Sequence, residues 1–289
     1  MLILKRPWTI PRTGASVRPE ISRFAAGVVC PGVSRNFIGP VDSTVVTGPE
    51  PTPTISGLAW TGNASSSQAY ANTRRAAKIV SSSSESHLTA LVVFRAVSAT
   101  GTLVAMGSTD GSSGNTLCDI YLSTGALGFR LQTNAGILLY NTPSSAFGAN
   151  DGNWHTAVVR APLGVTTPES LDYFADGKHQ GTVSRETGAT ATTFNVVCVN
   201  VIRRGGSSIV YGGYQVALFV PLVGVLMPDA WCIGATQSPS AAFNAIFAPQ
   251  QIIIPTAAAA ASSLPTLSAS TYAPGSLTAT GWRPQITAS

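Results

Sequence analysis

Residues 171–183, Leu-Asp-Tyr-Phe-Ala-Asp-Gly-Lys-His-Gln-Gly-Thr-Val, contain the strongest hairpin signal in the chain. Asp176 and Gly177 form a dipeptide that favours the two-residue turn of an antiparallel hairpin, and the residues on both sides are typical of strands. We therefore expect a tight hairpin here, with Asp176 and Gly177 at its turn.

Short apolar or alternating runs, separated by Gly, Ser, Asn and Asp, continue on both sides of this hairpin. β-Branched and aromatic residues are enriched in these runs, as they are in strands. Such a series of short strands favours two antiparallel sheets packed as a sandwich. The clearest runs are residues 88–97, 102–106, 117–122, 127–132, 137–140, 154–160, 171–175, 194–202 and 215–220.

The chain has few charges for its 289 residues. Charged residues make up 10% of it and hydrophobic residues 44%, whereas a typical soluble domain has about a quarter charged residues. This composition favours a protein that is covered by neighbours in a large assembly over an isolated monomer. No run reaches the roughly 18 to 20 apolar residues of a membrane span, and the start of the chain lacks the apolar core of a secretory signal. We expect no membrane insertion and synthesis in the cytosol.

The net charge of +5 is concentrated near the N-terminus. The first 24 residues carry five Lys or Arg residues and one Glu, and so account for +4 of it. The rest of the chain is close to neutral, which argues against a nucleic-acid-binding domain. Residues 1–25, which mix Pro, Arg and Gly, are expected to form an extended basic arm in front of a β body at residues 26–225.

The pattern changes again in residues 226–289. Ser238 followed by Pro239 predicts the start of a short helix that ends near Phe247. Beyond this helix, prolines recur about every ten residues in a Pro-, Ala-, Ser- and Thr-rich stretch, so we expect an extended C-terminal arm.

This C-terminal arm is unusual because it lacks charge. The 53 residues from Ala230 to Trp282 contain no Asp, Glu, Lys or Arg. Disordered tails are usually rich in charge, so an uncharged arm with Ile253, Tyr272 and Trp282 is expected to pack against a neighbouring subunit or against its own domain.

Two motifs in the centre of the chain carry a resemblance to a known family. Residues 151–160, Asp-Gly-Asn-Trp-His-Thr-Ala-Val-Val-Arg, and Phe-Ala-Asp-Gly at 174–177 resemble the pattern of laminin-G-like, concanavalin A-like jelly rolls, which commonly have Tyr-Val-Asp-Gly in the second motif. The resemblance implies that Trp154, next to His155, packs between the sheets, and that Asp176 and Gly177 make the turn. The expected fold is all-β: an antiparallel two-sheet jelly-roll sandwich with extended N- and C-terminal arms and one short C-terminal helix.

The two ends of the chain resemble a narrower group. Residues 1–14, Met-Leu-Ile-Leu-Lys-Arg-Pro-Trp-Thr-Ile-Pro-Arg-Thr-Gly, and residues 264–287, from Leu-Pro-Thr-Leu-Ser to Gly-Trp-Arg-Pro-Gln-Ile-Thr, resemble segments that frame this jelly roll in proteins of tailed bacteriophages and prophages. The resemblance implies a virion protein that is assembled in the bacterial cytoplasm. Its implied partners are other virion proteins and further copies of itself, a trimer by analogy with fibres and decorations. The expected assembly residues are Lys5, Arg6, Trp8, Ile253, Tyr272 and Trp282.

The sequence offers no catalytic constellation. Jelly-roll glycosidases place paired carboxylates on one strand face as Glu-x-Asp, and neither Glu-x-Asp nor Asp-x-Glu occurs in this sequence. The candidate bases are His87, His155 and His179, of which His155 is expected to be a strand histidine satisfied by its neighbours. With no Gly-x-Ser-x-Gly elbow and no phosphate-binding loop, we expect no enzyme activity.

One loop offers oxygen ligands. Residues 110–119, Asp-Gly-Ser-Ser-Gly-Asn-Thr-Leu-Cys-Asp, carry Asp110, Asn115 and Asp119. Some laminin-G-like relatives bind calcium at such loops, and carboxylate and amide oxygens suit that ion. The ligand number falls short of a complete site, so a solvated hairpin loop is favoured over calcium binding and no cofactor is expected.

Two roles remain open at this stage. The leading one is a tail- or baseplate-associated protein that presents the jelly roll to a glycan of the host surface, with aromatic side chains that stack on sugars. The alternative is a capsid-surface decoration protein, whose arms clamp neighbouring subunits.

Overall fold

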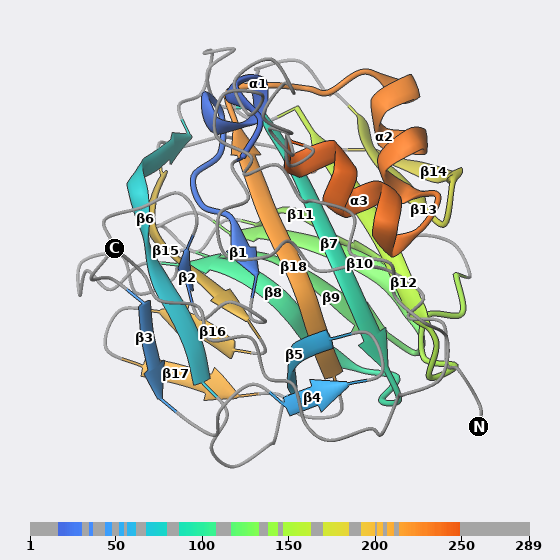
Figure 1. Ribbon diagram of the computed structural model, residues 1–289, viewed down its shortest axis with the longest axis horizontal. Coiled ribbons are helices and arrows are strands. Elements are labelled where there is room, and N and C mark those ends of the chain that lie inside the picture. Colours follow the sequence, from blue (N-terminus) through green and yellow to red (C-terminus); the bar gives the residue numbers. More distant parts are fainter. Residues whose placement is uncertain are drawn as a thin grey trace, which may run out of the picture. The chain divides into compact units, whose positions relative to one another are not determined.

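The computed structural model describes fifteen segments of the chain. The described segments are drawn in colour in Figure 1. The chain divides into two compact units, Met1–Gln250 and Gln251–Ser289, and every described segment lies in the first unit. The described residues are 17–30, 35–36, 44–47, 52–54, 57–61, 68–79, 87–107, 117–132, 138–143, 147–162, 170–184, 192–199, 201–204, 207–210 and 214–248.

Two antiparallel sheets form the body of the first unit. In the nine-stranded sheet, seven strands follow one another and a further pair is attached through β18. The order is β14 (Lys178–Ser184), β13 (Ser170–Ala175), β12 (Trp154–Ala161), β7 (Leu88–Ala96), β18 (Tyr214–Val223), β1 (Val29–Cys30) and β2 (Arg35–Asn36), while β5 (Gly57–Thr61) pairs with β18 and with β4 (Thr52–Thr54).

The second sheet has seven strands, and a separate hairpin follows it in sequence. Its order is β11 (Leu138–Pro143), β10 (Ala126–Gln132), β9 (Leu117–Ser123), β8 (Gly101–Gly107), β15 (Thr192–Val199), β6 (Gln68–Ile79) and β3 (Thr44–Thr47). The hairpin consists of β16 (Val201–Arg204) and β17 (Ser207–Val210), and β16 contacts β8 and β9. The all-β, two-sheet sandwich of jelly-roll type predicted from the sequence is confirmed.

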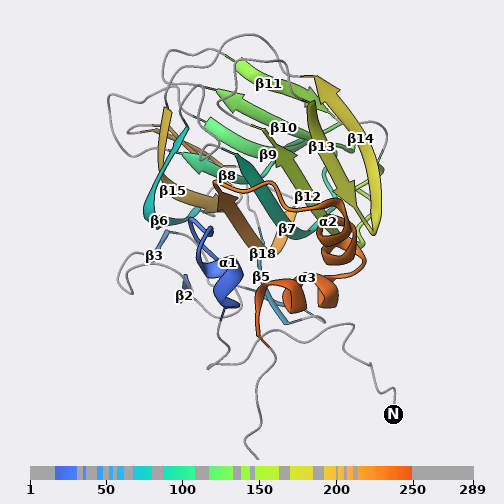
Figure 2. The ribbon, with the colours of Figure 1, turned by 90° about the horizontal axis from the view of Figure 1, so that it is seen from above.

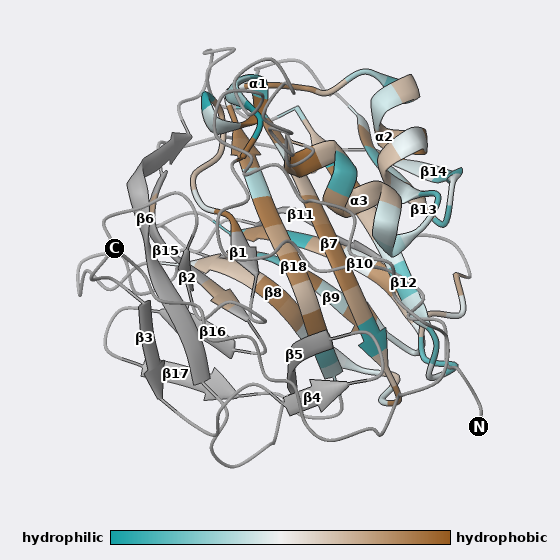
Figure 3. Ribbon diagram, in the orientation of Figure 1, coloured by the Kyte–Doolittle hydropathy of each residue, from teal (hydrophilic) through white to brown (hydrophobic). Residues whose placement is uncertain are grey.

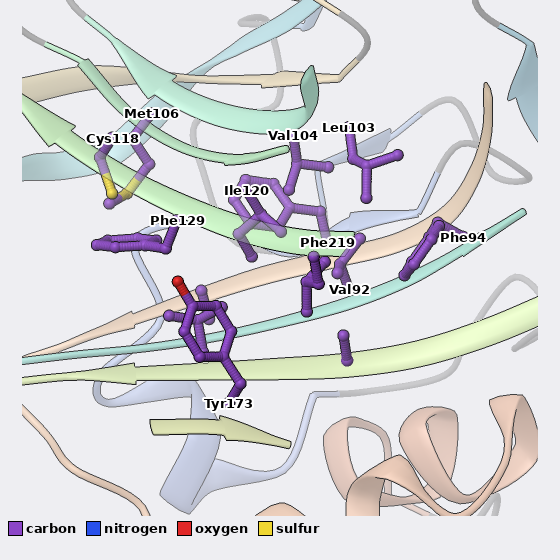
Figure 4. Close-up of a cluster of buried hydrophobic side chains, with 14 of the residues drawn as sticks. Val92, Phe94, Leu103, Val104, Met106, Cys118, Ile120, Phe129, Tyr173 and Phe219 are labelled. Carbon is purple, nitrogen blue, oxygen red and sulfur yellow. The ribbon is translucent and has the colours of Figure 1, made fainter. Parts of the chain in front are cut away.

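The core lies between the two sheets because strand residues alternate in direction. On β7, Val92 and Phe94 face the seven-stranded sheet, and Leu91 and Val93 face away from it. The side chains that meet across the core point toward one another in Figure 4. They include Val92, Phe94, Tyr173 and Phe219 of the nine-stranded sheet and Val104, Met106, Ile120 and Phe129 of the seven-stranded sheet.

The nine-stranded sheet is apolar on both faces, and helices cover its outer face. Figure 2 shows α1 (Pro19–Ser22), α2 (Asp229–Thr236) and α3 (Pro239–Ile246) on the side opposite the seven-stranded sheet. Both β7 and β18 are brown, hydrophobic, along most of their length in Figure 3. The residues buried between sheet and helices include Ile21, Leu91, Val158, Phe174, Leu218, Cys232, Phe243 and Ile246.

Part of the segment 1–25, expected to be an extended arm, has a different structure. Residues 19–22 form α1, and Ile21 is only 1% exposed. The backbone N–H of Arg18 donates to the carbonyl of Ile246 at 2.9 Å, and Ala25 bridges to Leu222. Residues 17–25 are therefore part of the packed body, and residues 1–16 lie outside the described residues.

The C-terminal part of the body also differs from the expected boundary at residue 225. Two helices follow this residue instead of one, and the compact unit extends to Gln250. The predicted helix is α3, where the Ser238 hydroxyl accepts from the backbone N–H of Ala241 at 3.1 Å. The additional helix, α2, follows Pro228 without a side-chain cap, so the sequence signal for its start is missing. No helix in the described part of the chain is long and apolar enough to cross a membrane.

Candidate functional site

The Asp-Gly turn joins β13 to β14 as predicted. Asp176 and Gly177 have φ values of 46° and 78°, which are the left-handed conformations that a tight hairpin turn requires. The backbone N–H of Gly177 donates to the hydroxyl of Thr236 at 3.3 Å, so the turn also contacts the end of α2. A Cβ atom at residue 177 would lie 3.3 Å from Cγ of Gln237. The turn thus needs glycine both for its backbone angle and for this close contact.

A histidine between two carboxylates lies beside this turn. We call Asp151, His155 and Asp176 the histidine cluster. Nδ1 of His155 lies 2.7 Å from Oδ2 of Asp176, and Nε2 lies 2.9 Å from Oδ1 of Asp151. The His155 side chain is 9% exposed and contacts the rings of Phe94 and Phe147.

The two carboxylates favour the protonated imidazole. Burial alone would lower the pKa of His155, but the hydrogen bonds to Asp176 and Asp151 and the negative charges of both residues outweigh it and raise the pKa. The backbone N–H of Asn153 holds the pKa of Asp151 at about 2, with a smaller effect from His155. A general base needs a ring nitrogen that can accept the substrate proton, and both ring nitrogens are engaged here. The prediction of a strand histidine satisfied by its neighbours is confirmed.

The neighbouring Trp154 is not where the family resemblance implied. Trp154 is partly buried and packs against the cluster under the helices, on the outer face of the nine-stranded sheet. His155 pairs with Phe94 and shares with it the face toward the other sheet. Successive strand residues point to opposite faces, so Trp154 and His155 cannot both face the core, and the expectation that Trp154 packs between the sheets is wrong.

A second cluster lies on the outer face of the seven-stranded sheet. Cys118, Ile120 and Leu122 of β9 face the core, so Asp119 and Tyr121 face outward. We call Thr102, Asp119, Tyr121, Gly128 and Arg130, from the adjacent strands β8, β9 and β10, the sheet-face cluster.

A buried ion pair organises the sheet-face cluster. The Asp119 side chain is 0% exposed and Arg130 is 27% exposed. Nε and Nη2 of Arg130 donate to the two carboxylate oxygens of Asp119 at 2.9 and 2.8 Å, and the Thr102 hydroxyl donates to Oδ2 at 2.7 Å. The bidentate geometry fixes the plane of the guanidinium group.

The tyrosine of the cluster lies close against its cross-strand partner. Tyr121 is opposite Gly128, and a Cβ atom at residue 128 would lie 2.6 to 2.9 Å from three carbons of the Tyr121 ring. The guanidinium carbon of Arg130 is 5.5 Å from the ring centroid. Burial, and secondarily the charge of Asp119, raise the pKa of the Tyr121 hydroxyl despite Arg130. The glycine thus allows a partly exposed aromatic ring to rest on the sheet beside a fixed cation.

The proposed calcium ligands are only partly described. Asp110 and Asn115 lie outside the described residues. Asp119 lies in β9, where Arg130 and Thr102 occupy its carboxylate oxygens, so its place is in a structural ion pair. Among the described residues, no group of three or more His, Cys, Asp or Glu side chains could hold a metal ion.

A third charged cluster joins the sheet to the helical layer. Nη2 of Arg160 donates to Asp172 at 2.6 Å, and Nη1 donates to Asp229 of α2 and to the carbonyl of Met227. The guanidinium group also lies over the Phe174 ring, 5.2 Å from its centroid. No local sequence pattern predicts this cluster, because Asp229 is 69 residues from Arg160. Through these contacts, Arg160 attaches α2 to the nine-stranded sheet.

The expected assembly residues cannot be placed. Lys5, Arg6, Trp8, Ile253, Tyr272 and Trp282 all lie outside the described residues.

Comparisons with known proteins support the architecture. No family model matches the sequence, and no curated protein matches it. The receptor-binding domain of botulinum neurotoxin C/D mosaic serotype is a structural neighbour with a TM-score of 0.51 and 10% identity; the match covers 73% of this chain and 50% of that domain. The Ruminococcus gnavus IT-sialidase CBM40 bound to α2,3 sialyllactose matches with a TM-score of 0.41 and 15% identity over 53% of this chain and 83% of that one. At 10% identity, the match to the botulinum neurotoxin domain establishes the fold alone, a jelly-roll β-sandwich.

Proposed function

We propose that this chain is a non-enzymatic, glycan-binding protein of a tailed-bacteriophage particle, carried on the tail or baseplate. The sheet-face cluster is the observation that carries the glycan part of the proposal. The resemblance of residues 1–14 and 264–287 to the framing segments of phage proteins supports the virion part.

The sheet-face cluster has the chemistry that a sugar requires. The aliphatic face of a pyranose stacks on an aromatic ring, and Tyr121 provides a partly exposed ring that rests on Gly128. Sugar hydroxyls accept hydrogen bonds from guanidinium groups, and Arg130 is 27% exposed beside that ring. The buried Asp119 holds Arg130 in place before a ligand arrives, which reduces the entropy lost on binding.

The position of the cluster on the sheet favours a ligand on the β9 and β10 side. Thr102 of β8 is only 1% exposed, and β16 contacts β8 more extensively than it contacts β9. Tyr121 and Arg130, one and two strands further along the sheet, are the more exposed members. A receptor-binding domain of botulinum neurotoxin, half of which this fold matches, is a precedent for a binding role.

Two carboxylates in the described part of the chain, those of Asp151 and Asp172, lack the property of a glycosidase acid. A glycosidase needs a general acid whose pKa is raised. Here the pKa of Asp151 is lowered, chiefly by its hydrogen bond from the Asn153 backbone N–H. Burial alone would raise the pKa of Asp172, but hydrogen bonds from Arg160, His179 and Thr182 outweigh burial and lower it. Both groups are therefore ionised at neutral pH and cannot donate the proton.

Binding of the purified chain to an array of bacterial surface polysaccharides tests the glycan part. Tyr121→Ala should abolish binding, and Gly128→Ala should weaken it without removing any functional group, because the new methyl group displaces the ring. Lys178→Ala, an exposed residue of β14 in the other sheet, is the control and should bind normally. Equal binding by wild type and Tyr121→Ala would contradict the assignment, and hydrolysis of any polysaccharide would contradict the non-enzymatic role.

Cryo-electron microscopy of intact particles tests the virion part. Density for the jelly roll at the tail tip or baseplate is the expected result. Density on the head lattice would instead support the capsid-surface decoration protein, for which the uncharged residues 230–282 are also suited. Absence from purified particles would refute both virion roles.

A further inference from the structure

Residues 147–153 connect the two sheets at one end of the sandwich, and we call them the strap. The backbone N–H of Ala149 donates to the carbonyl of Gly125, in the turn between β9 and β10, at 3.0 Å. The backbone N–H of Gly152 donates to the carbonyl of Ala96, at the end of β7, at 2.9 Å. One short segment thus bonds to both sheets, and it covers part of the core with Ala149, which is 0% exposed, and Phe147.

Side chains add a second set of bonds to the strap. Nε of Arg95 donates to the carbonyl of Gly152. Asp151 accepts from the backbone N–H of Asn153 and from His155, whose other ring nitrogen bonds to Asp176 in the hairpin turn. The histidine cluster therefore links the strap to the β13–β14 hairpin, which in turn contacts α2.

We propose that the histidine cluster is a proton-controlled latch: the protonated imidazole of His155 ties the strap to the hairpin turn, and loss of its proton releases Asp151 and loosens the strap. This proposal does not rest on the proposed glycan site, which lies on the outer face of the seven-stranded sheet.

The number of N–H groups on the His155 ring determines whether the latch is closed. An imidazolium ion has two N–H groups and can donate to both carboxylates, whereas neutral imidazole has one. Asp176 keeps that donor, because its Oδ1 is also held by the Thr156 backbone N–H at 3.1 Å and its own backbone N–H bonds to the carbonyl of Thr156. The unprotonated Nε2 then faces the Asp151 carboxylate, which is repulsive. Asp151 is 45% exposed and can turn toward water.

The charged groups around the imidazole determine when it loses the proton. Among the described residues, the elements around His155 carry Asp151, Asp176, Arg95 and Lys178, and, elsewhere along β12, β13 and β14, also Arg160, Asp172 and His179. Of these groups, the carboxylates of Asp151 and Asp176 are the ones that contact the His155 ring. The other ring neighbours are Phe94 and Phe147, which carry no charge. Both carboxylates raise the pKa of His155 against the effect of burial. The latch is thus closed in mildly acidic solution and opens as the pH rises through the pKa of His155.

Amide hydrogen exchange on the full-length chain tests this inference, with each rate divided by its intrinsic rate at the same pH. Between about pH 6 and about pH 9, the protection of the Gly152 and Asn153 amides should fall roughly tenfold, as expected for the loss of one partly exposed charge-assisted hydrogen bond. Amides within β12, such as that of Val158, should keep their protection.

Two variants separate the latch from a general effect of pH. In Asp151→Asn, residue 151 carries no charge and favours the protonated ring much less than a carboxylate does, so strap protection should depend on pH much less than in the wild type. His179→Gln removes another histidine that contacts an aspartate and should behave as wild type. Strap protection that is constant with pH in the wild type, or that varies with pH as strongly in Asp151→Asn as in the wild type, would overturn the proposal.

Discussion

Replacement of Arg130 by methionine tests whether the sheet-face cluster is held together by its ion pair. The substitution keeps an unbranched side chain but removes two of the three hydrogen bonds to Asp119, at 2.9 and 2.8 Å. Asp119 is 0% exposed, and Thr102 alone remains to bond its carboxylate. An unpaired buried charge costs about 3 to 5 kcal/mol. Since Arg130 itself is 27% exposed and its removal admits some water, we expect about 3 kcal/mol.

A double-mutant cycle separates the charge from the packing. Asp119→Asn in the Arg130→Met background removes the buried charge, and its amide still accepts from Thr102, so it should recover about half of the loss, roughly 1 to 2 kcal/mol. Urea unfolding followed by tryptophan fluorescence measures all four proteins. A free energy of unfolding of Arg130→Met within about 1 kcal/mol of the wild-type value would show that the ion pair does not hold the cluster together. A double variant no more stable than Arg130→Met would show the same.

Three further predictions concern other parts of the fold. Trp154→Ala should cost roughly 1 to 3 kcal/mol in thermal unfolding, less than a residue buried between the sheets, because Trp154 is only partly buried. Ser238→Ala should cost about 1 kcal/mol by loss of the α3 cap. The free energy of unfolding, measured against pH, should have a maximum. On the acidic side it should fall below about pH 4, as Asp151, whose folded-state pKa is about 2, becomes protonated. On the alkaline side it should fall as the pH rises through the raised pKa of His155.

The parts of the fold that local chemistry determines were predictable. The Asp176–Gly177 turn and the Ser238 cap act over two to four residues, and both occur as expected. Strand β6 was missed because residues 68–79, Gln-Ala-Tyr-Ala-Asn-Thr-Arg-Arg-Ala-Ala-Lys-Ile, lack the apolar alternation of a strand. It pairs with β15 and β3, so contacts distant in sequence decide its conformation.

The ion pair of the sheet-face cluster could have been found from the sequence. Thr124 and Gly125 form a two-residue connection between β9 and β10, and such a connection sets the register of the pair. Counting back from this turn places Arg130 directly opposite Asp119. Asp119 was considered as a calcium ligand, although residues 117–122 were expected to form a strand, because the register of that strand was not used. The histidine cluster could not be predicted from one turn alone, because Asp176 contacts His155 only when β12 and β13 are paired.

The small number of charges in this chain has a structural explanation in the part that the structure describes. The acidic residues described are Glu20, Asp119, Asp151, Asp172, Asp176 and Asp229, and each of them contacts an arginine or a histidine. Most of these pairs join separate elements: two strands of one sheet, β12 and the strap, β12 and the hairpin turn, or the sheet and α2. Negative charge in this part of the fold therefore serves internal connections, and little of it is left unpaired at the surface. Such a surface offers little electrostatic attraction to a strongly basic partner.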